Sequence, residues 1–152
     1  MNSDPITLKY FPRTFTEAES RASFERIKSF LELHEFGLWG AEEKETEKFM
    51  GFIGLSEQNV EGISFTPCIE IGWRLDKEFW GKGYATEGAE AVLKFGQDSL
   101  HLTEIYSYTS RINLPSINVM RKIGLRARPE FDFDHPMIPN EDELRNHVVY
   151  ST

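Results

Sequence analysis

Two glycines flank a lysine in the segment DKEFWGKGYATEG (76–88), and this spacing could bind an anion. Gly81 and Gly83 let the backbone turn tightly and come close to a ligand. The apolar spacing that follows predicts a helix over about 84–100, whose first N–H groups have no partner of their own. The helix dipole and these N–H groups favour a phosphate or pyrophosphate, and Lys82 could add a charged contact. An ordinary turn before a helix is the alternative.

A second polar cluster lies in SRINLPSINVMRKIGL (110–125). A proline in the first turn and Gly124 in the C′ position predict a short helix over about 115–123. Polar side chains gather at its start and along it: Asn113, Ser116, Asn118, Arg121 and Lys122. Because Asn and Ser are favoured at helix starts whatever the function, capping alone is the alternative interpretation of Asn113 and Ser116.

The surrounding elements can also be predicted. Thr16 and Glu19 have the spacing of a capping box. They predict an amphipathic helix to about residue 34, whose apolar face should pack against the core: Ala18, Ala22, Ile27, Phe30 and Leu31. Aromatic and β-branched runs over 36–75 predict an antiparallel meander. Further strands are predicted in EIYSYT (104–109) and HVVYS (147–151), with a loop before the last.

Composition excludes several classes of function. The chain has 152 residues, 39% of them hydrophobic, which suits one domain with its own core over residues 1–152. Seventeen basic and 25 acidic side chains give a net charge of −8, which argues against nucleic acid or anionic membranes as partners and favours a cationic one. A lone Cys68 indicates a reducing compartment and no thiolate metal site. We find no signal-like or membrane-spanning segment and expect a cytoplasmic protein.

The segments IGWRLDKEFWGKGYATEG (71–88) and NLPSINVMRKIGL (113–125), in this order, resemble the two acyl-CoA motifs of the GNAT superfamily of N-acetyltransferases. They resemble the branch that includes ribosomal-protein N-terminal acetyltransferases, and the ending FDFDHP…LRNHVVY is similar to it too. The resemblance implies an α/β (α+β) acyltransferase fold, with a central, mostly antiparallel mixed sheet, splayed strands and helices on both faces. The family's first strand is not found. An unpaired edge around FGLWGA (36–41) would then favour a homodimer.

The resemblance also implies acetyl-CoA as co-substrate, without a metal, and assigns residues to it. Main-chain amides of the glycine loop would hold the pyrophosphate: Gly81, Lys82, Gly83, Tyr84, Ala85 and Thr86. The preceding strand would pair with the pantetheine arm through the main chain of Trp73, Arg74 and Leu75. Asn113, Ser116 and Asn118 match positions that contact the pantetheine or lie near the thioester sulfur. Lys122, with Arg121, would meet the adenosine 3′-phosphate or simply face solvent.

Amide formation requires a base for the ammonium and a donor for the oxyanion. Glu70 is the candidate base. It shares one strand face with Gly72 and Arg74, so its carboxylate can point into the cleft. Partial burial would raise its pKa, whereas a solvated position or pairing with Arg74 would leave it without this role.

Two positions depart from the family pattern. Met120 stands where many members have a tyrosine that acts as the acid, and Trp80 stands where the loop pattern has Gln or Arg. We therefore expect Ser116 to protonate the departing thiolate, directly or through water. A backbone N–H near Trp73 or Arg74 would stabilise the oxyanion.

His135 lies between Asp132 and Asp134 on one side and a proline on the other. This cluster could supply a base, recognise a substrate ammonium, hold a metal or simply be solvated. His147, in a predicted strand, is expected to be packed.

The predicted activity is direct acetyl transfer to a primary amine, possibly a protein N-terminus. Cys68 has no obvious base beside it, which argues against a covalent intermediate. The alternatives are acetylation of a small-molecule amine, such as a polyamine, amino sugar or amino acid, and a non-catalytic CoA-binding module.

Overall fold

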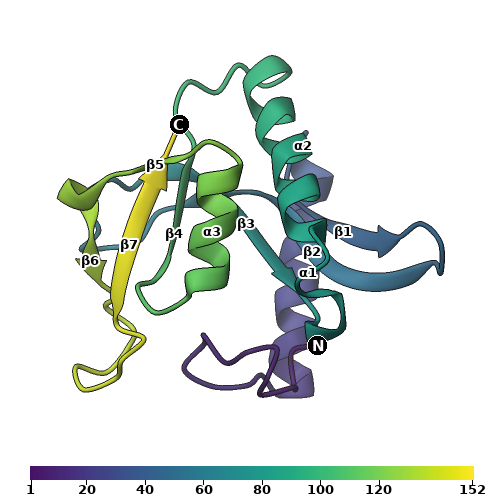
Figure 1. Ribbon diagram of the computed structural model, residues 1–152, viewed down its shortest axis with the longest axis horizontal. Coiled ribbons are helices and arrows are strands. Elements are labelled where there is room, and N and C mark those ends of the chain that lie inside the picture. Colours follow the sequence, from purple (N-terminus) through teal and green to yellow (C-terminus); the bar gives the residue numbers. More distant parts are fainter.

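A mixed seven-stranded sheet dominates the computed structural model, which describes residues 1–152 (Figure 1). Its strands are β1 (Leu38–Glu43), β2 (Lys48–Gln58), β3 (Cys68–Leu75), β4 (Tyr106–Ser110), β5 (Arg126–Ala127), β6 (Phe133–Asp134) and β7 (Asn146–Ser151). The order is β1-β2-β3-β4-β7-β5, with β6 also on β7. Only β3 and β4 run parallel. The predicted fold class is therefore confirmed, and β1 is an edge strand.

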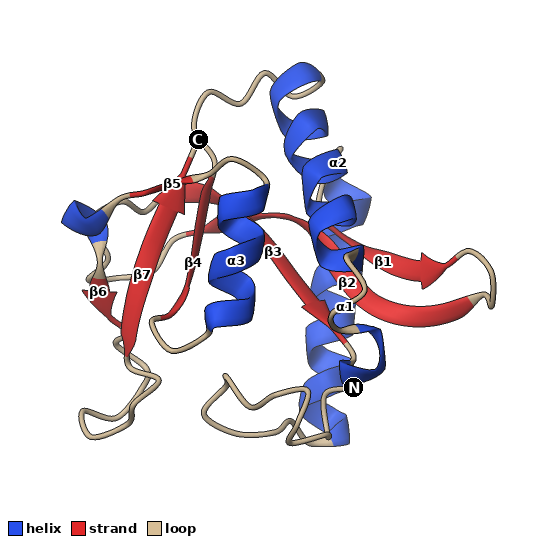
Figure 2. Cartoon of the chain, in the orientation of Figure 1, coloured by secondary structure: helices blue, strands red, loops and turns tan.

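Helices lie on both sides of this sheet. The helices are α1 (Glu17–Leu33), α2 (Tyr84–Asp98) and α3 (Leu114–Lys122), with short 3₁₀ turns η1 (Lys77–Phe79) and η2 (Pro129–Phe131). In Figures 1 and 2, α2 and α3 lie in front of the sheet and α1 lies behind it. None of the helices is long and apolar enough to cross a membrane.

Local signals placed most element ends correctly. The Thr16 hydroxyl accepts from the Glu19 N–H at 3.2 Å and the Glu19 carboxylate accepts from the Thr16 N–H at 2.8 Å, so the capping box is confirmed. Gly124, just after α3, has φ +87°, the left-handed conformation expected at C′. The loop predicted before the last strand was too simple, because β5, η2 and β6 lie within it and two of them pair with β7.

The prediction that α1 packs its apolar face on the core is wrong. No residue of α1 is buried, Phe24 is 60% exposed and Leu33 is 81% exposed. The first half of the apolar face consists of Ala18 and Ala22, whose methyl groups offer little area to bury. The end of the helix lies close to the segment that leads into β1, where Leu31 packs over Gly37.

The core has two parts, one on each face of the sheet. The larger contains 14 buried residues beneath α2 and α3, among them Ile71, Ile105 and Tyr150. The smaller contains Ile63, Phe65, Tyr106 and Val149. Because neighbouring residues of a strand face opposite ways, this second cluster lies on the face that also carries Glu70.

Candidate active site

The sheet opens between β3 and β4. β3 pairs with β2 at eight positions, but with β4 only through Glu70 and Tyr106. The Asp76 N–H donates to the Met50 carbonyl of β2 at 2.8 Å, and successive residues of a strand alternate in direction. Trp73 therefore directs its N–H and C=O away from β2 and into the gap. The strand thus offers an open backbone edge to an extended ligand, as the resemblance implies for the pantetheine arm.

Trp80 connects this edge to the glycine loop. Its indole Nε1 donates to the Leu75 carbonyl at 2.8 Å, so that carbonyl is already occupied. Sequence reasoning assigned Trp80 no function, because the contact depends on the path of the chain through η1. The main-chain N–H and C=O of Trp73 and the N–H of Leu75 therefore remain available to a ligand in the gap.

The glycine loop leaves its main-chain N–H groups free. Gly81 and Gly83 have φ +72° and +89°, and a Cβ built at either would meet nothing within 4 Å. None of the six successive main-chain N–H groups over 81–86 donates a hydrogen bond to a protein acceptor. Lys82 is exposed, with its Nζ 5.4 Å from the ring centroid of Phe79. These free donors at the start of α2 fit a pyrophosphate, the group that the resemblance assigns to this loop.

Glu70 lies at the point where β3 and β4 part. Its carboxyl is half-buried, and this burial raises its pKa to about 8, while hydrogen-bonding contacts with Gln58 and Tyr108 oppose the shift. Arg74 forms no ion pair with it, so the alternative of a Glu70–Arg74 pair is not observed. A carboxyl that titrates near neutral pH in a cleft is suited to proton transfer.

The start of α3 brings Asn113 and Ser116 together. Asn113 accepts from the Ser116 N–H at 3.3 Å and donates from Nδ2 to Thr109 at 2.9 Å, which supports the capping interpretation for Asn113. Ser116 is half-buried. Asn118 and Lys122, further along, are exposed. Met120 is 1% exposed in the core and carries no proton that it could donate.

The carboxylates around His135 already have cationic partners. Asp132 pairs with Arg111 at 2.9 Å and Asp134 with Arg145 at 3.6 Å, so a substrate ammonium would compete with these arginines. No group of three or more His, Cys, Asp or Glu could hold a metal ion. His147 is buried, as predicted, with its ring centroid 5.0 Å from that of His135, and burial lowers the pKa of both imidazoles.

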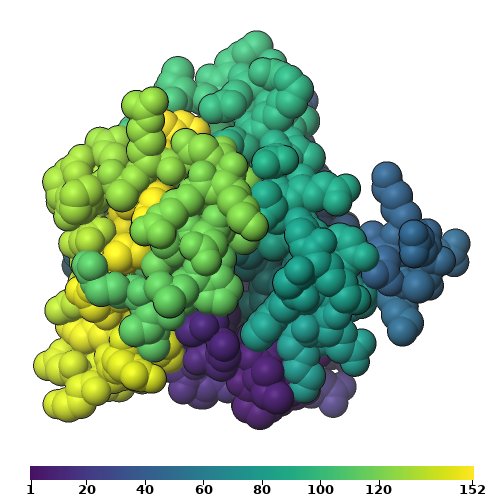
Figure 3. Space-filling view, viewed as in Figure 1, coloured from purple at the N-terminus to yellow at the C-terminus, as the bar shows by residue number.

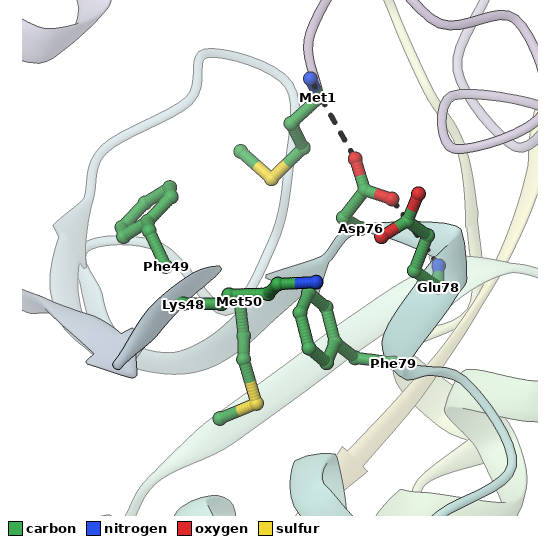
Figure 4. Close-up of a pocket in the computed structure, with 7 residues that line it drawn as sticks. All are labelled: Met1, Lys48, Phe49, Met50, Asp76, Glu78 and Phe79. Atoms are coloured by element: carbon green, nitrogen blue, oxygen red, sulfur yellow. Dashed lines mark hydrogen bonds and ion pairs between the residues drawn. The ribbon is translucent and has the colours of Figure 1, made fainter. Parts of the chain in front are cut away.

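A cavity of about 360 Å³ lies elsewhere, at the ends of β2 and β3 (Figure 4). Met1, Asp76 and Phe79 are among its lining residues, and the Met1 amine pairs with Asp76 at 3.6 Å. None of the predicted site residues lines it. Figure 3 shows a groove between α3 and the segment that joins η1 to α2, which is where the two predicted motifs face each other.

A sheet opened at a parallel pair, with a donor-rich loop at the start of the following helix, defines an acyl-CoA-dependent acetyltransferase fold. The acetyltransferase (GNAT) domain family matches residues 1–126, and the chain belongs to this family. The family prediction is confirmed.

Similar proteins support this family assignment. The chain is 28% identical to the N-acetyltransferase YnaD of Bacillus subtilis in an alignment of 155 residues that covers 98% of this chain and 81% of YnaD. It is 32% identical over 133 residues to the FsC-acetyl coenzyme A-N(2)-transacetylase of Aspergillus fumigatus, covering 82% of this chain and 55% of that protein. The crystal structure of a GNAT-family acetyltransferase from Bacillus anthracis superposes with a TM-score of 0.76 at 28% identity, covering 99% and 83% of the two chains.

Proposed function

We propose that the protein transfers the acetyl group of acetyl-CoA directly to a primary amine. The observation that carries this proposal is the position of Glu70, a half-buried carboxyl with a pKa of about 8 at the mouth of the gap between β3 and β4. Membership of the GNAT family supports it. The Aspergillus fumigatus relative is named for N(2)-transacetylation, which supports a nitrogen acceptor.

The binding residues would act through the main chain. The loop over 81–86 offers its free N–H groups to the pyrophosphate, and Trp73 and Leu75 offer a strand edge to the pantetheine arm. Asn118 and Lys122 face solvent, where they can meet the arm and the 3′-phosphate. Bound acetyl-CoA supplies a thioester carbonyl that a neutral amine can attack.

Three groups of the chain would handle protons and charge. Glu70 removes a proton from the substrate ammonium, directly or through water. Of the two oxyanion donors predicted, Trp73 is favoured over Arg74, because the Arg74 N–H points toward β2. Ser116 gives a proton to the departing thiolate. Cys68 takes no part, since burial and the charges of nearby glutamates raise the pKa of its thiol to about 11.

The acceptor is either a peptide N-terminus or a small amine. We also propose that two copies associate through the free edge of β1. The lone Cys68 suits a reducing, cytoplasmic environment. A β-bulge between Ala41 and Glu42 limits this edge to a short regular stretch.

The test is thiol release by the purified protein with a panel of amines and peptides. Glu70→Gln should lower kcat by about 100-fold or more while the Kd for acetyl-CoA in calorimetry stays the same. Glu57→Gln, an exposed glutamate of β2, is the matched control and should behave like the parent. Tight acetyl-CoA binding without thiol release from any acceptor would instead identify a non-catalytic CoA-binding module.

A further inference from the structure

Arg74 is a half-buried cation that no carboxylate neutralises. Its guanidinium carbon lies 4.2, 5.2 and 5.3 Å from the ring centroids of Phe11, Phe52 and Phe15. Its hydrogen-bond partner is Asn2, whose Oδ1 accepts from Nη1 at 3.2 Å. The Nε atom is buried and has no partner. Donors that are buried and unpaired are costly, so this arrangement calls for an explanation.

The other half-buried arginines show how unusual this is. Arg128 and Arg145 each pair with a carboxylate, at 2.8 and 3.6 Å. Asp4, in the segment that covers Arg74, is already bound to Lys77 at 2.9 Å. Burial lowers the pKa of Arg74 to about 10, and the group is still charged at neutral pH. An anionic ligand group would provide the missing counter-charge.

The strand leaves room for such a ligand between Arg74 and the candidate base. Glu70, Gly72 and Arg74 share one face of β3, and a Cβ at Gly72 would meet only the Glu70 Oε1, at 3.9 Å. The space is bounded on the β2 side, because a Cβ on Gly54 would lie 2.0 Å from the Gly37 carbonyl oxygen. Gly72 therefore forms an open floor between Glu70 and Arg74, its two neighbours on this face of β3.

We propose that Arg74 binds an anionic group of the acceptor, so that the acceptor is a primary amine that carries a carboxylate or phosphate at its other end. This inference rests on the proposed acetyl transfer and names its substrate class. Glu70 and Arg74 are four residues apart, which limits their separation along the strand to about 13 Å. The amine end meets Glu70 and the anionic end meets Arg74.

The anionic group takes no part in the bond changes. A new bond forms between the amine nitrogen and the acetyl carbon, and the carbon–sulfur bond of the thioester breaks. An alkylammonium and acetyl-CoA thus give an N-acetyl amide, the free CoA thiol and one released proton. Arg74 is a positioning and specificity residue for this step.

The experiment compares acceptors that differ only in charge. Glycine, 4-aminobutanoate, 6-aminohexanoate and 8-aminooctanoate are each assayed by thiol release against their carboxamides, and ω-aminoalkyl phosphates of matching length form a third arm. We expect kcat/KM at least about tenfold higher for the anionic acceptor than for its carboxamide, with an optimum at one chain length. The better of the two anionic arms identifies the ligand group as carboxylate or phosphate.

Arg74→Met removes the charge and keeps an unbranched stem among the phenylalanine rings. The ratio of kcat/KM between anionic and carboxamide acceptors should fall to about one, and Arg74→Lys should restore part of it. A parent enzyme that does not distinguish the two acceptors, or a ratio that survives in Arg74→Met, would overturn the proposal.

Folding is controlled by acetyl-CoA calorimetry and by a second pair of variants. Gly72→Val fills the open floor and should abolish the preference, whereas Gly40→Val, on exposed β1 where a Cβ makes ordinary contact, should keep it. If no amine is acetylated, calorimetry with 6-aminohexanoate separates the two proposals. Binding by the parent but not by Arg74→Met supports the subsite while acetyl transfer fails, and equal or absent binding by both refutes the subsite.

Discussion

The Nδ2 of Asn113 donates to the Oγ of Ser116 at 3.1 Å, so the Ser116 hydroxyl accepts one hydrogen bond and keeps its own hydrogen free to donate. One residue thus orients the other at the start of α3. This geometry separates two functions that the sequence places side by side: Asn113 caps the helix, and Ser116 has a proton to give.

Ser116→Ala should therefore lower kcat by about 10- to 100-fold without changing the Kd for acetyl-CoA. The measurement is steady-state thiol release combined with calorimetry. Ser29→Ala, at an exposed position of α1, serves as the control. An unchanged kcat in Ser116→Ala would assign the leaving-group proton to water.

The pH profile should report Glu70. Since burial raises its pKa to about 8, the carboxyl is mostly protonated at neutral pH and becomes a base only as pH rises. We expect kcat/KM to increase up to about pH 8 and then level off, with an acceptor amine of low pKa so that its own titration lies below this range. Glu70→Gln should have a flat, low profile. The same inflection in Glu70→Gln would show that another group is titrating.

The same shift predicts how stability depends on pH. The folded protein binds the Glu70 proton more tightly than the unfolded chain, whose carboxyl has a pKa of 4.5. The stabilisation is therefore complete below about pH 4.5 and is lost as pH rises toward 8. Relative to the parent, Glu70→Gln should gain up to about 4 kcal/mol between pH 5 and pH 9. Denaturant unfolding at both pH values measures this, and a difference that does not vary with pH contradicts it.

The glycine loop can be tested by filling it. Gly83→Trp should abolish acetyl-CoA binding in calorimetry, because the added ring would occupy the space that faces the free N–H groups over 81–86. Gly62 has nearly the same φ, +87°, and open space around it, in the turn between β2 and β3. Gly62→Trp carries similar backbone strain and should bind normally. Loss of binding in both variants would indicate strain rather than a blocked site.

Local chemistry explains what could be predicted from the sequence. The capping box of Thr16 and Glu19, the left-handed Gly124 and the alternation that places Glu70 and Arg74 on one face depend on neighbours within a few positions. These signals act over one turn or one strand.

Long-range contacts explain which features could not be predicted from the sequence. The exposure of α1 depends on how far the helix lies from the sheet, which its own amphipathic pattern does not encode. The Asp132–Arg111 pair joins positions 21 apart, and the Arg74–Asn2 hydrogen bond joins positions 72 apart. Arg74 was predicted to contribute its main chain to the cofactor site, with a side-chain pair to Glu70 as the alternative, because nothing near it in sequence shows that its side chain lacks a carboxylate.

The single register pair between β3 and β4 divides the sheet into two half-sheets that share one rung. Beyond that rung their facing amides rely on water in the free protein, so deuterium should enter there quickly. An extended ligand bound in the gap would hydrogen-bond to both half-sheets and slow deuterium exchange on both sides. The protein with bound cofactor would therefore be more rigid across the sheet than the free protein.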